Sequence, residues 1–88
     1  MMEKTVKVIN SLGIHARPAS LIVQTAIKFK SSIQLVKDGA SADAKSIMSV
    51  MMLAAAQDSN VIIRANGEDE AEAVEAIIKL FQLKFNEE

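Results

Sequence analysis

The sequence contains no cysteine, tryptophan or tyrosine and has one proline, three glycines and one histidine. Without cysteine, the chain has no disulfide, no thiolate metal ligand and no cysteine nucleophile. A single histidine, His15, excludes a multi-histidine metal centre within one chain, so we expect neither a metal nor another cofactor. Three phenylalanines are the only aromatic residues and leave few stacking platforms for nucleobases, so we expect no nucleic-acid partner.

The chain has a balanced charge and no long apolar run. Ten basic and eleven acidic residues give a formal net charge of −1, which disfavours binding to a nucleic-acid backbone. The longest apolar run, 50–56, is far shorter than the roughly 20 residues that span a membrane. The first residues also lack the apolar segment of a signal peptide. We therefore expect a single domain over 1–88, located in the cytoplasm and without a membrane partner.

Hydrophobic periodicity predicts the secondary structure. Alternating apolar and polar residues predict four strands, which cover 3–9, 32–37, 40–44 and 61–65. Apolar residues at steps of three and four predict three helices, the first of about three turns from Ala16, then 46–55 and a long last helix that reaches Phe85. The Asp38-Gly39 pair predicts a two-residue hairpin between the second and third strands.

The same periodicity predicts which helix side chains are buried. The first helix should bury Ala19, Ile22, Val23, Ala26 and Ile27, and the last should bury Ala71, Val74, Ile77, Ile78, Phe81 and Phe85. Asp69 or Glu68 is expected to cap the last helix. The middle helix carries Ile47, Met48, Met51 and Met52, of which we expect at least one to be buried, because methionines at helical spacing commonly belong to a core.

The element order β-α-β-β-α-β-α predicts an α/β (α+β) fold. It is an open-faced two-layer sandwich with a four-stranded antiparallel sheet and all three helices on one face, because each helix must bury its apolar stripe. Strand 61–65 should be central, between strands 3–9 and 32–37. The open face of the sheet should carry Thr5, Lys7, Gln34 and Arg64.

The segment 13–19, Gly-Ile-His-Ala-Arg-Pro-Ala, holds the candidate chemistry. His15 lies where a loop becomes a helix, so backbone N–H groups of the first turn, those of Ala16 and Arg17, can bind an anion such as phosphate. The Arg17 guanidinium adds planar donors that suit phosphoryl oxygens. A nucleophilic imidazole beside them suits reversible phosphoryl transfer through phosphohistidine. The alternative is that His15 merely caps the helix and Arg17 is a solvated charge.

Ser46 lies at the start of the middle helix and has two interpretations. As an N-cap it would stabilise the helix by about 1 kcal/mol. As a regulatory phosphosite it would place a dianion where the helix tolerates it but an acidic partner does not. Around His15 we expect an apolar surface that partner proteins cover during transfer, made of Leu21, Ile47, Met48 and Met51, with Arg17 and Gln24 at its rim.

Two segments carry a family resemblance. Residues 13–19 resemble the active-site signature of the HPr family, the histidine-containing phosphocarriers of the bacterial phosphoenolpyruvate–sugar phosphotransferase system. Residues 44–48, Ala-Lys-Ser-Ile-Met, resemble the family's second signature around a regulatory serine. The resemblance runs over essentially the whole chain, including the opening 3–6 and the entry to the last helix at 67–70.

This resemblance implies a relay carrier rather than a self-sufficient enzyme. His15 accepts a phosphoryl group at Nδ1 from phospho-enzyme I and donates it to enzyme IIA domains of sugar permeases, while Arg17 stabilises the phosphoryl charge. Ser46 matches the serine that HPr kinase/phosphorylase modifies, after which the carrier engages a catabolite-repression transcription regulator. A shuttle between such partners is expected to be a monomer.

The sequence departs from the family pattern around the middle helix. Ser49, Ala54 and Asp58 stand where members commonly carry glycine, and Asp43 replaces a common asparagine. None of them touches His15 or Arg17. Two alternatives remain at this point, namely a purely regulatory binding module for carbon catabolite repression controlled through Ser46, and a carrier in a nitrogen-related phosphotransferase relay.

Overall fold

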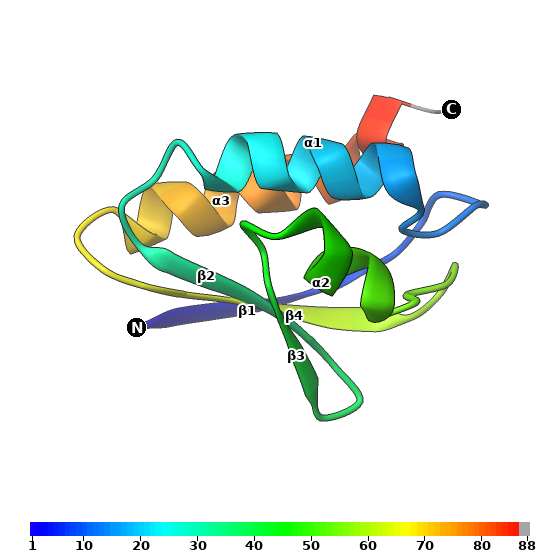
Figure 1. The fold of residues 1–88 in the computed structure, drawn as a ribbon, viewed down its shortest axis with the longest axis horizontal. Helices are drawn as coiled ribbons and strands as arrows, with labels where there is room; N and C mark the ends of the chain where they lie inside the picture. Colours follow the sequence, from blue (N-terminus) through cyan, green and yellow to red (C-terminus); the bar gives the residue numbers. More distant parts are fainter. Residues whose placement is uncertain (87–88) are drawn as a thin grey trace.

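The computed structural model, which describes residues 1–86, has a four-stranded antiparallel sheet with three helices over one face (Figure 1). Its elements are β1 Met2–Lys7, α1 Ala16–Ala26, β2 Ser32–Lys37, β3 Ala40–Asp43, α2 Ile47–Met52, β4 Asn60–Asn66, α3 Glu70–Gln82 and the short 3-10 helix η1 Lys84–Asn86. The predicted open-faced α/β sandwich and its βαββαβα order are confirmed.

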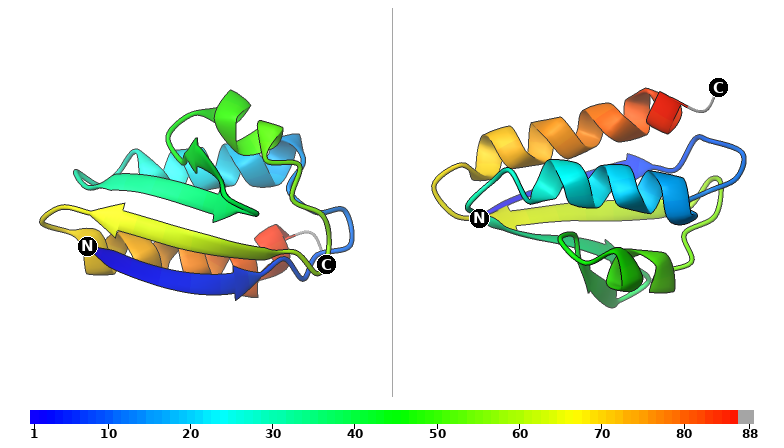
Figure 2. Two further views of the ribbon diagram at one scale, coloured as in Figure 1. Left: turned by 90° about the horizontal axis from the view of Figure 1, so that it is seen from below. Right: turned by 45° about the horizontal axis from the view of Figure 1, so that its top comes forward.

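The sheet has the strand order β1-β4-β2-β3, so β4 is central as predicted (Figure 2). Alternation along β4 buries Val61, Ile63 and Ala65 beneath the helices. On the open face, Thr5, Lys7 and Gln34 are exposed and Arg64 is half-buried, as the pattern predicted. Arg64 lies opposite both Glu3 and Gln34 and forms an ion pair with Glu3 across the strands.

The first strand is shorter than the predicted 3–9. It ends at Lys7, and Val8 then leaves the β1–β4 ladder to donate its N–H to the Ser59 carbonyl at 2.9 Å. The Val8 side chain is fully buried, whereas Ile9 is exposed. The alternation that predicted a longer strand therefore continues in the burial pattern, although the strand pairing has already ended.

The two long helices close the core, and α1 lies between α3 and α2 (Figure 2). Ala19, Ile22 and Ala26 of α1 are buried, but Ile27 is exposed, although its backbone is still helical with φ −68° and ψ −12°. The prediction that Ile27 belongs to the buried stripe is wrong. At 3.6 residues per turn, Ile27 lies roughly 140° around the helix from Ile22, so its side chain points away from the centre of the buried face.

The helix α3 also ends earlier than the apolar stripe suggested. It stops at Gln82, and Phe85 is reached through a turn in which Phe85 itself has a left-handed backbone, φ 54°. Phe85 is nevertheless fully buried and packs edge-on against Phe81, with ring centroids 4.9 Å apart. At the N-terminal end of α3, Ala71 is exposed and Ala73 is buried. The predicted stripe is therefore wrong at Ala71, and Ala73 takes its place.

The helix α2 is six residues long, instead of the predicted 46–55. Val50 on the helix and Leu53 just past it occupy its inward side and are buried. All four apolar side chains expected to include a core residue are exposed, namely Ile47, Met48, Met51 and Met52. That expectation is wrong because a one-and-a-half-turn helix at the rim of the sheet has room for few inward positions.

Two lysines bind carbonyl groups that follow the ends of α1 and α2. The Lys37 ammonium donates to the carbonyl oxygens of Leu53 and Ala54, at 3.3 and 3.4 Å. The Lys45 ammonium donates to the Phe29 carbonyl at 2.9 Å, just past the end of α1. Cations are favourable at helix C-termini, where carbonyl groups lack intrahelical partners. The chain thereby fastens the ends of α1 and α2 to the hairpin β2–β3 and the segment that follows it.

Asp69 occupies the N-cap position of α3, as one of the two predicted candidates, but its side chain does not cap that helix. Its carboxylate accepts the Lys30 N–H and the Ser31 N–H, each at 2.9 Å, and the Ser31 hydroxyl at 2.5 Å. The Ser31 hydroxyl, followed by the Lys30 N–H, lowers the pKa of the Asp69 carboxyl from 3.8 to about 2. Asp69 therefore joins the loop before α3 to the loop after α1.

The free energy of unfolding should fall in acid partly through Asp69. Because folding lowers its pKa, the stability that this carboxylate contributes is fully present above 3.8 and is lost as the pH falls towards about 2. We expect Asp69→Asn to be less stable than the unmodified chain at pH 6 and to show a shallower loss between pH 4 and 2. Urea unfolding followed at several pH values measures both effects.

The matched control is Glu75→Gln, which removes an exposed carboxylate further along α3. Its stability should follow the same pH dependence as the unmodified chain. Identical pH profiles for Asp69→Asn and Glu75→Gln would show that the Asp69 bonds do not stabilise the fold.

Ala54 has a left-handed backbone, φ 51°, just past α2. A side chain in this region costs roughly 1–2 kcal/mol, and glycine avoids that cost. We expect Ala54→Gly to raise the free energy of unfolding by about 1 kcal/mol after the greater flexibility of unfolded glycine is subtracted. The same change in a helix, Ala71→Gly, should lower stability by about 0.5–1 kcal/mol. Urea denaturation that gives both substitutions the same sign would contradict this account.

Candidate functional site

His15 is the N-cap residue of α1, with an extended backbone of φ −95° and ψ −164°. Its carbonyl accepts the Ala19 N–H at 3.0 Å and so begins the helix. The imidazole itself makes no capping hydrogen bond to α1, so His15 occupies the cap position through its backbone. His15 as a whole is half-buried, so part of the residue is accessible from outside the protein.

The loop before His15 is held in place by backbone contacts. The Asn10 side chain donates to the Gly13 carbonyl at 2.7 Å, and the Gly13 N–H donates to the Asn10 carbonyl at 3.2 Å. The next N–H, of Ile14, donates to the Ala55 carbonyl at 2.9 Å. Gly13 has φ 68°, and a Cβ there would lie 2.5 Å from the Ala55 oxygen, so only glycine fits this approach.

The first turn of α1 begins with N–H groups that the helix itself does not use. The first N–H to bond a helical carbonyl is that of Ala19, and Pro18, which is buried, has no N–H at all. The backbone N–H groups of Ala16 and Arg17 therefore remain outside the helical ladder, at its positive end. The Arg17 side chain is exposed. An imidazole, two backbone donors and a guanidinium thus come from three consecutive residues.

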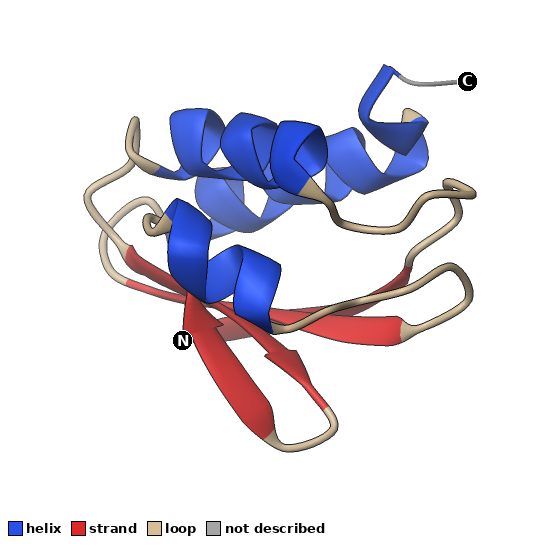
Figure 3. Ribbon diagram, turned by 45° about the vertical axis from the view of Figure 1, so that its right-hand side comes forward, coloured by secondary structure: helices blue, strands red, loops and turns tan. Residues whose placement is uncertain are grey.

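The expected apolar surface comes from α1 and α2, which pack side by side (Figure 3). On α2, Ile47 and Met51 are just under half exposed, while Met48 is 74% exposed. On α1, Leu21 is half-buried against the core, and Gln24 is exposed with its amide donating to the Ser20 hydroxyl at 3.0 Å. The five predicted partner-binding residues therefore lie on two neighbouring helices and all retain some exposure.

Two exposed apolar side chains were missing from the sequence-based set. Leu12 is 72% exposed in the loop that leads to His15, and Met52 is 80% exposed at the end of α2. Sequence position could have suggested Leu12, because it lies three residues before His15. Its exposure could not be predicted, because an apolar residue between a strand and a helix is as easily buried.

Ser46 is the N-cap of α2, as one of its two interpretations predicted. Its hydroxyl oxygen accepts the Ser49 N–H at 3.3 Å, and its side chain is half-buried. The adjacent Lys45 is held at the Phe29 carbonyl. The structural role of Ser46 is therefore confirmed, and it is compatible with a modification at the same oxygen.

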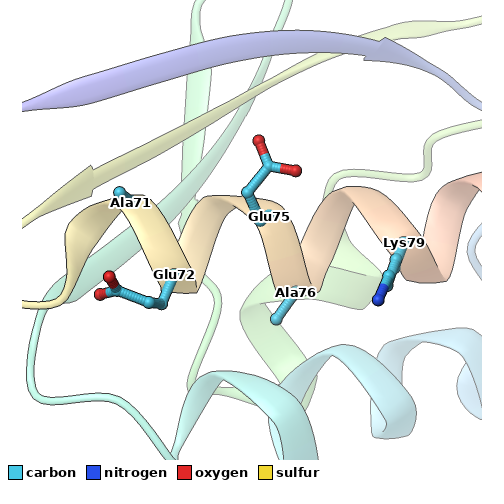
Figure 4. A pocket seen from close by; sticks show the side chains of 5 residues that line it. All are labelled: Ala71, Glu72, Glu75, Ala76 and Lys79. Atoms are coloured by element: carbon cyan, nitrogen blue, oxygen red, sulfur yellow. The ribbon is translucent and has the colours of Figure 1, made fainter.

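A cavity of about 500 Å³ lies elsewhere, along the outer side of α3 (Figure 4). It is lined by α3 alone, through Ala71, Glu72, Glu75, Ala76 and Lys79. The glutamates Glu72 and Glu75 are exposed and form a solvated helix face. This depression shares no residue with the His15 site.

Residues 1–86 contain no group of three or more His, Cys, Asp or Glu side chains placed to hold a metal ion. Within the same residues, no helix is both long and apolar enough to cross a bilayer.

Comparison with known proteins identifies the family. The family model described as the PTS HPr component phosphorylation site matches residues 2–82. A phosphocarrier protein HPr of Treponema pallidum is 52% identical over 88 residues, which cover all of both chains. A crystal structure of HPr from Thermoanaerobacter tengcongensis superposes with a TM-score of 0.95 at 48% identity, over 100% of this chain and 99% of that one.

A further relative with a similar fold is a catabolite-repression protein. Crh, a catabolite-repression protein of Bacillus subtilis, is 44% identical and superposes with a TM-score of 0.76, over 93% of this chain and 94% of that one. It is described as a dimer with a swapped domain. The family model, the full-length similarity and the shared fold lead to one conclusion. The chain belongs to the HPr family, the phosphocarriers of the phosphotransferase system.

Proposed function

We propose that His15 is the residue that carries the phosphoryl group in this relay. The observation that supports it most is the position of the half-buried His15 at the N-terminus of α1, two residues before the exposed Arg17. The helix end and Arg17 both favour the negative charge that a phosphoryl group brings. The regulatory binding module and the nitrogen-related relay are not favoured, since neither is needed to account for this site.

In the first transfer, Nδ1 of His15 attacks the phosphorus carried by phospho-enzyme I. The new N–P bond forms as the bond between phosphorus and the donor breaks, so the group moves without being released as free phosphate. The N–H groups of Ala16 and Arg17 and the Arg17 side chain bind the oxygens that hold charge during the transfer. In the second transfer an enzyme IIA domain attacks the same phosphorus, and the imidazole of His15 is the leaving group.

Both partners should cover the same surface of the carrier. Transfer requires water to be excluded around phosphorus, and the half-buried His15 ring needs a second protein to complete its enclosure. The exposed side chains of Ile47, Met48 and Met51 provide an apolar contact area beside it, and Leu21 and Gln24 border it on α1. Adaptable methionines suit a surface that must fit more than one partner.

We further infer that the carrier acts as a cytoplasmic monomer. The chain completes its hydrophobic core within one copy, with Val8, Ile22 and Phe81 all buried there. A shuttle with exposed contacts on α2 also dissociates faster from each partner when no second copy must move with it. The swapped dimer of Crh is the competing state, and sedimentation equilibrium of the purified chain separates the two.

We infer a second role for Ser46 as a phosphosite of HPr kinase/phosphorylase. Its hydroxyl is half-buried at the start of α2, directly before the exposed Ile47 and Met48. A phosphate there would place two negative charges at the edge of the apolar contact area that Ile47, Met48 and Met51 provide. Enzyme I binding should weaken, while a catabolite-repression regulator able to bind a phosphate would gain a contact.

Substitutions at the site test the relay. With enzyme I and phosphoenolpyruvate, His15→Ala should accept no phosphoryl group, because the acceptor nitrogen is gone. Arg17→Ala should be phosphorylated about 10- to 100-fold more slowly, since one charge-stabilising side chain is lost. Phosphorus NMR and the amount of acid-labile phosphate measure both outcomes.

The control for Arg17→Ala is Lys28→Ala, which removes an exposed cation beyond the far end of α1. It should be phosphorylated at the rate of the unmodified chain. If His15→Ala accepts the group as well as the unmodified chain does, the proposed relay residue is wrong.

A negative charge at position 46 tests the regulatory role. Ser46→Asp should raise the KM of enzyme I for the carrier several-fold. The difference in KM from Ser46→Ala should shrink as salt increases, because screening weakens charge repulsion. Ser41→Asp, which adds the same charge at an exposed site on β3, is the control and should have no such effect. Steady-state phosphorylation at two salt concentrations measures these values, and a salt-independent difference would argue against repulsion.

A further inference from the structure

Three methionines of one short helix project their thioethers outward. Met48 is 74% exposed, Met52 is 80% exposed and Met51 is 42% exposed. Met51 and Met52 follow Met48 by three and four residues, so all three lie on one side of α2. The opposite face is occupied by the buried Val50. The helix is therefore apolar on its inner and its outer side.

The remaining methionines provide an internal comparison. Met1 is 73% exposed, and Met2 is half-buried in β1, where it packs against the core. The N-terminus lies at the end of the molecule opposite the start of α1 (Figure 1). Met1 is thus exposed but far from the His15 site, and Met2 is partly protected. The other three methionines are exposed on α2, the helix that packs beside α1.

We propose that Met48, Met51 and Met52 form an oxidation site. Hydrogen peroxide oxidises them reversibly and thereby weakens partner binding at the apolar surface that they form on α2. A thioether sulfur attacks one peroxide oxygen, the O–O bond breaks, and the products are a methionine sulfoxide and water. The sulfur loses two electrons and the peroxide gains them. The chain has no cysteine, so the thiols that reverse the reaction must come from a methionine sulfoxide reductase.

The consequence rests on the proposed function of α2 as a contact surface. A sulfoxide replaces a flexible apolar group by a polar one, which a partner cannot bury without loss of binding. The core is not affected, because none of the three side chains belongs to it. Oxidation should therefore raise the KM of enzyme I for the carrier by about tenfold. This loss of affinity is comparable to that expected when one well-buried methionine is lost from an interface.

The first experiment locates the oxidation without reference to any activity. The chain is treated with hydrogen peroxide for increasing times, and sulfoxide at each methionine is quantified by peptide mass spectrometry. Met48, Met52 and the similarly exposed Met1 should be oxidised first, Met51 more slowly, and Met2 last. Oxidation of Met2 as fast as Met48 would overturn the assignment of α2 as the oxidation site.

The second experiment measures the KM of enzyme I for the carrier before and after treatment with peroxide. It compares the unmodified chain with a variant that carries Met48→Leu, Met51→Leu and Met52→Leu. The ratio of the two values should be about ten in the unmodified chain and close to one in the variant, which still carries Met1 and Met2. Treatment with methionine sulfoxide reductase should restore the original KM.

Equal ratios in the two proteins would overturn the proposal, because the effect would then come from Met1, Met2 or another residue. A loss of dispersed amide NMR signals at the same peroxide dose would also overturn it, because binding would then fail through unfolding. An unoxidised chain that accepts no phosphoryl group from enzyme I would refute the proposed function instead. The first experiment would still test the oxidation order, because it does not depend on phosphoryl transfer.

Discussion

The hydrogen bond from the Ile14 N–H to the Ala55 carbonyl connects the two halves of the candidate site. It joins the loop that precedes His15 to the segment that follows α2, and Gly13 permits the close approach because a Cβ would strike the same carbonyl. The N-terminus of α1 and the exposed face of α2 are thereby held in one arrangement. Both the proposed chemistry of His15 and the proposed contact surface depend on that arrangement, because a partner must cover them together.

Long-range polar contacts keep the helices at fixed places on the sheet. Lys45 binds the carbonyl just past α1, Lys37 binds two carbonyls past α2, and Asp69 binds the loop between α1 and β2. Each joins the end of one element to a segment remote in sequence. In a domain of 88 residues the core is small, so such contacts at its rim contribute substantially to the definition of a single structure.

Much of the fold could be predicted because its elements follow simple periods. The central position of β4 and the hairpin at Asp38-Gly39 followed from alternation and turn chemistry. The errors fell where an element ends. Phe85 continues the apolar pattern beyond α3, so the sequence showed its apolar character but not the loss of helical geometry. Ile27 keeps a helical backbone at the end of α1, but it is exposed. The methionines of α2 were misplaced because residue type does not distinguish a core side chain from an exposed contact.

The sequence by itself determined the order of elements and the family resemblance, since periodicity, turn residues and a local motif are properties of neighbouring residues. It also marked His15 and Arg17, which share one segment. Only the tertiary structure decided that Ala55 holds the loop before His15, that Asp69 binds Ser31 instead of capping α3, and which side of α2 remains exposed. These features join residues distant in sequence, so their geometry exists only once the chain has packed.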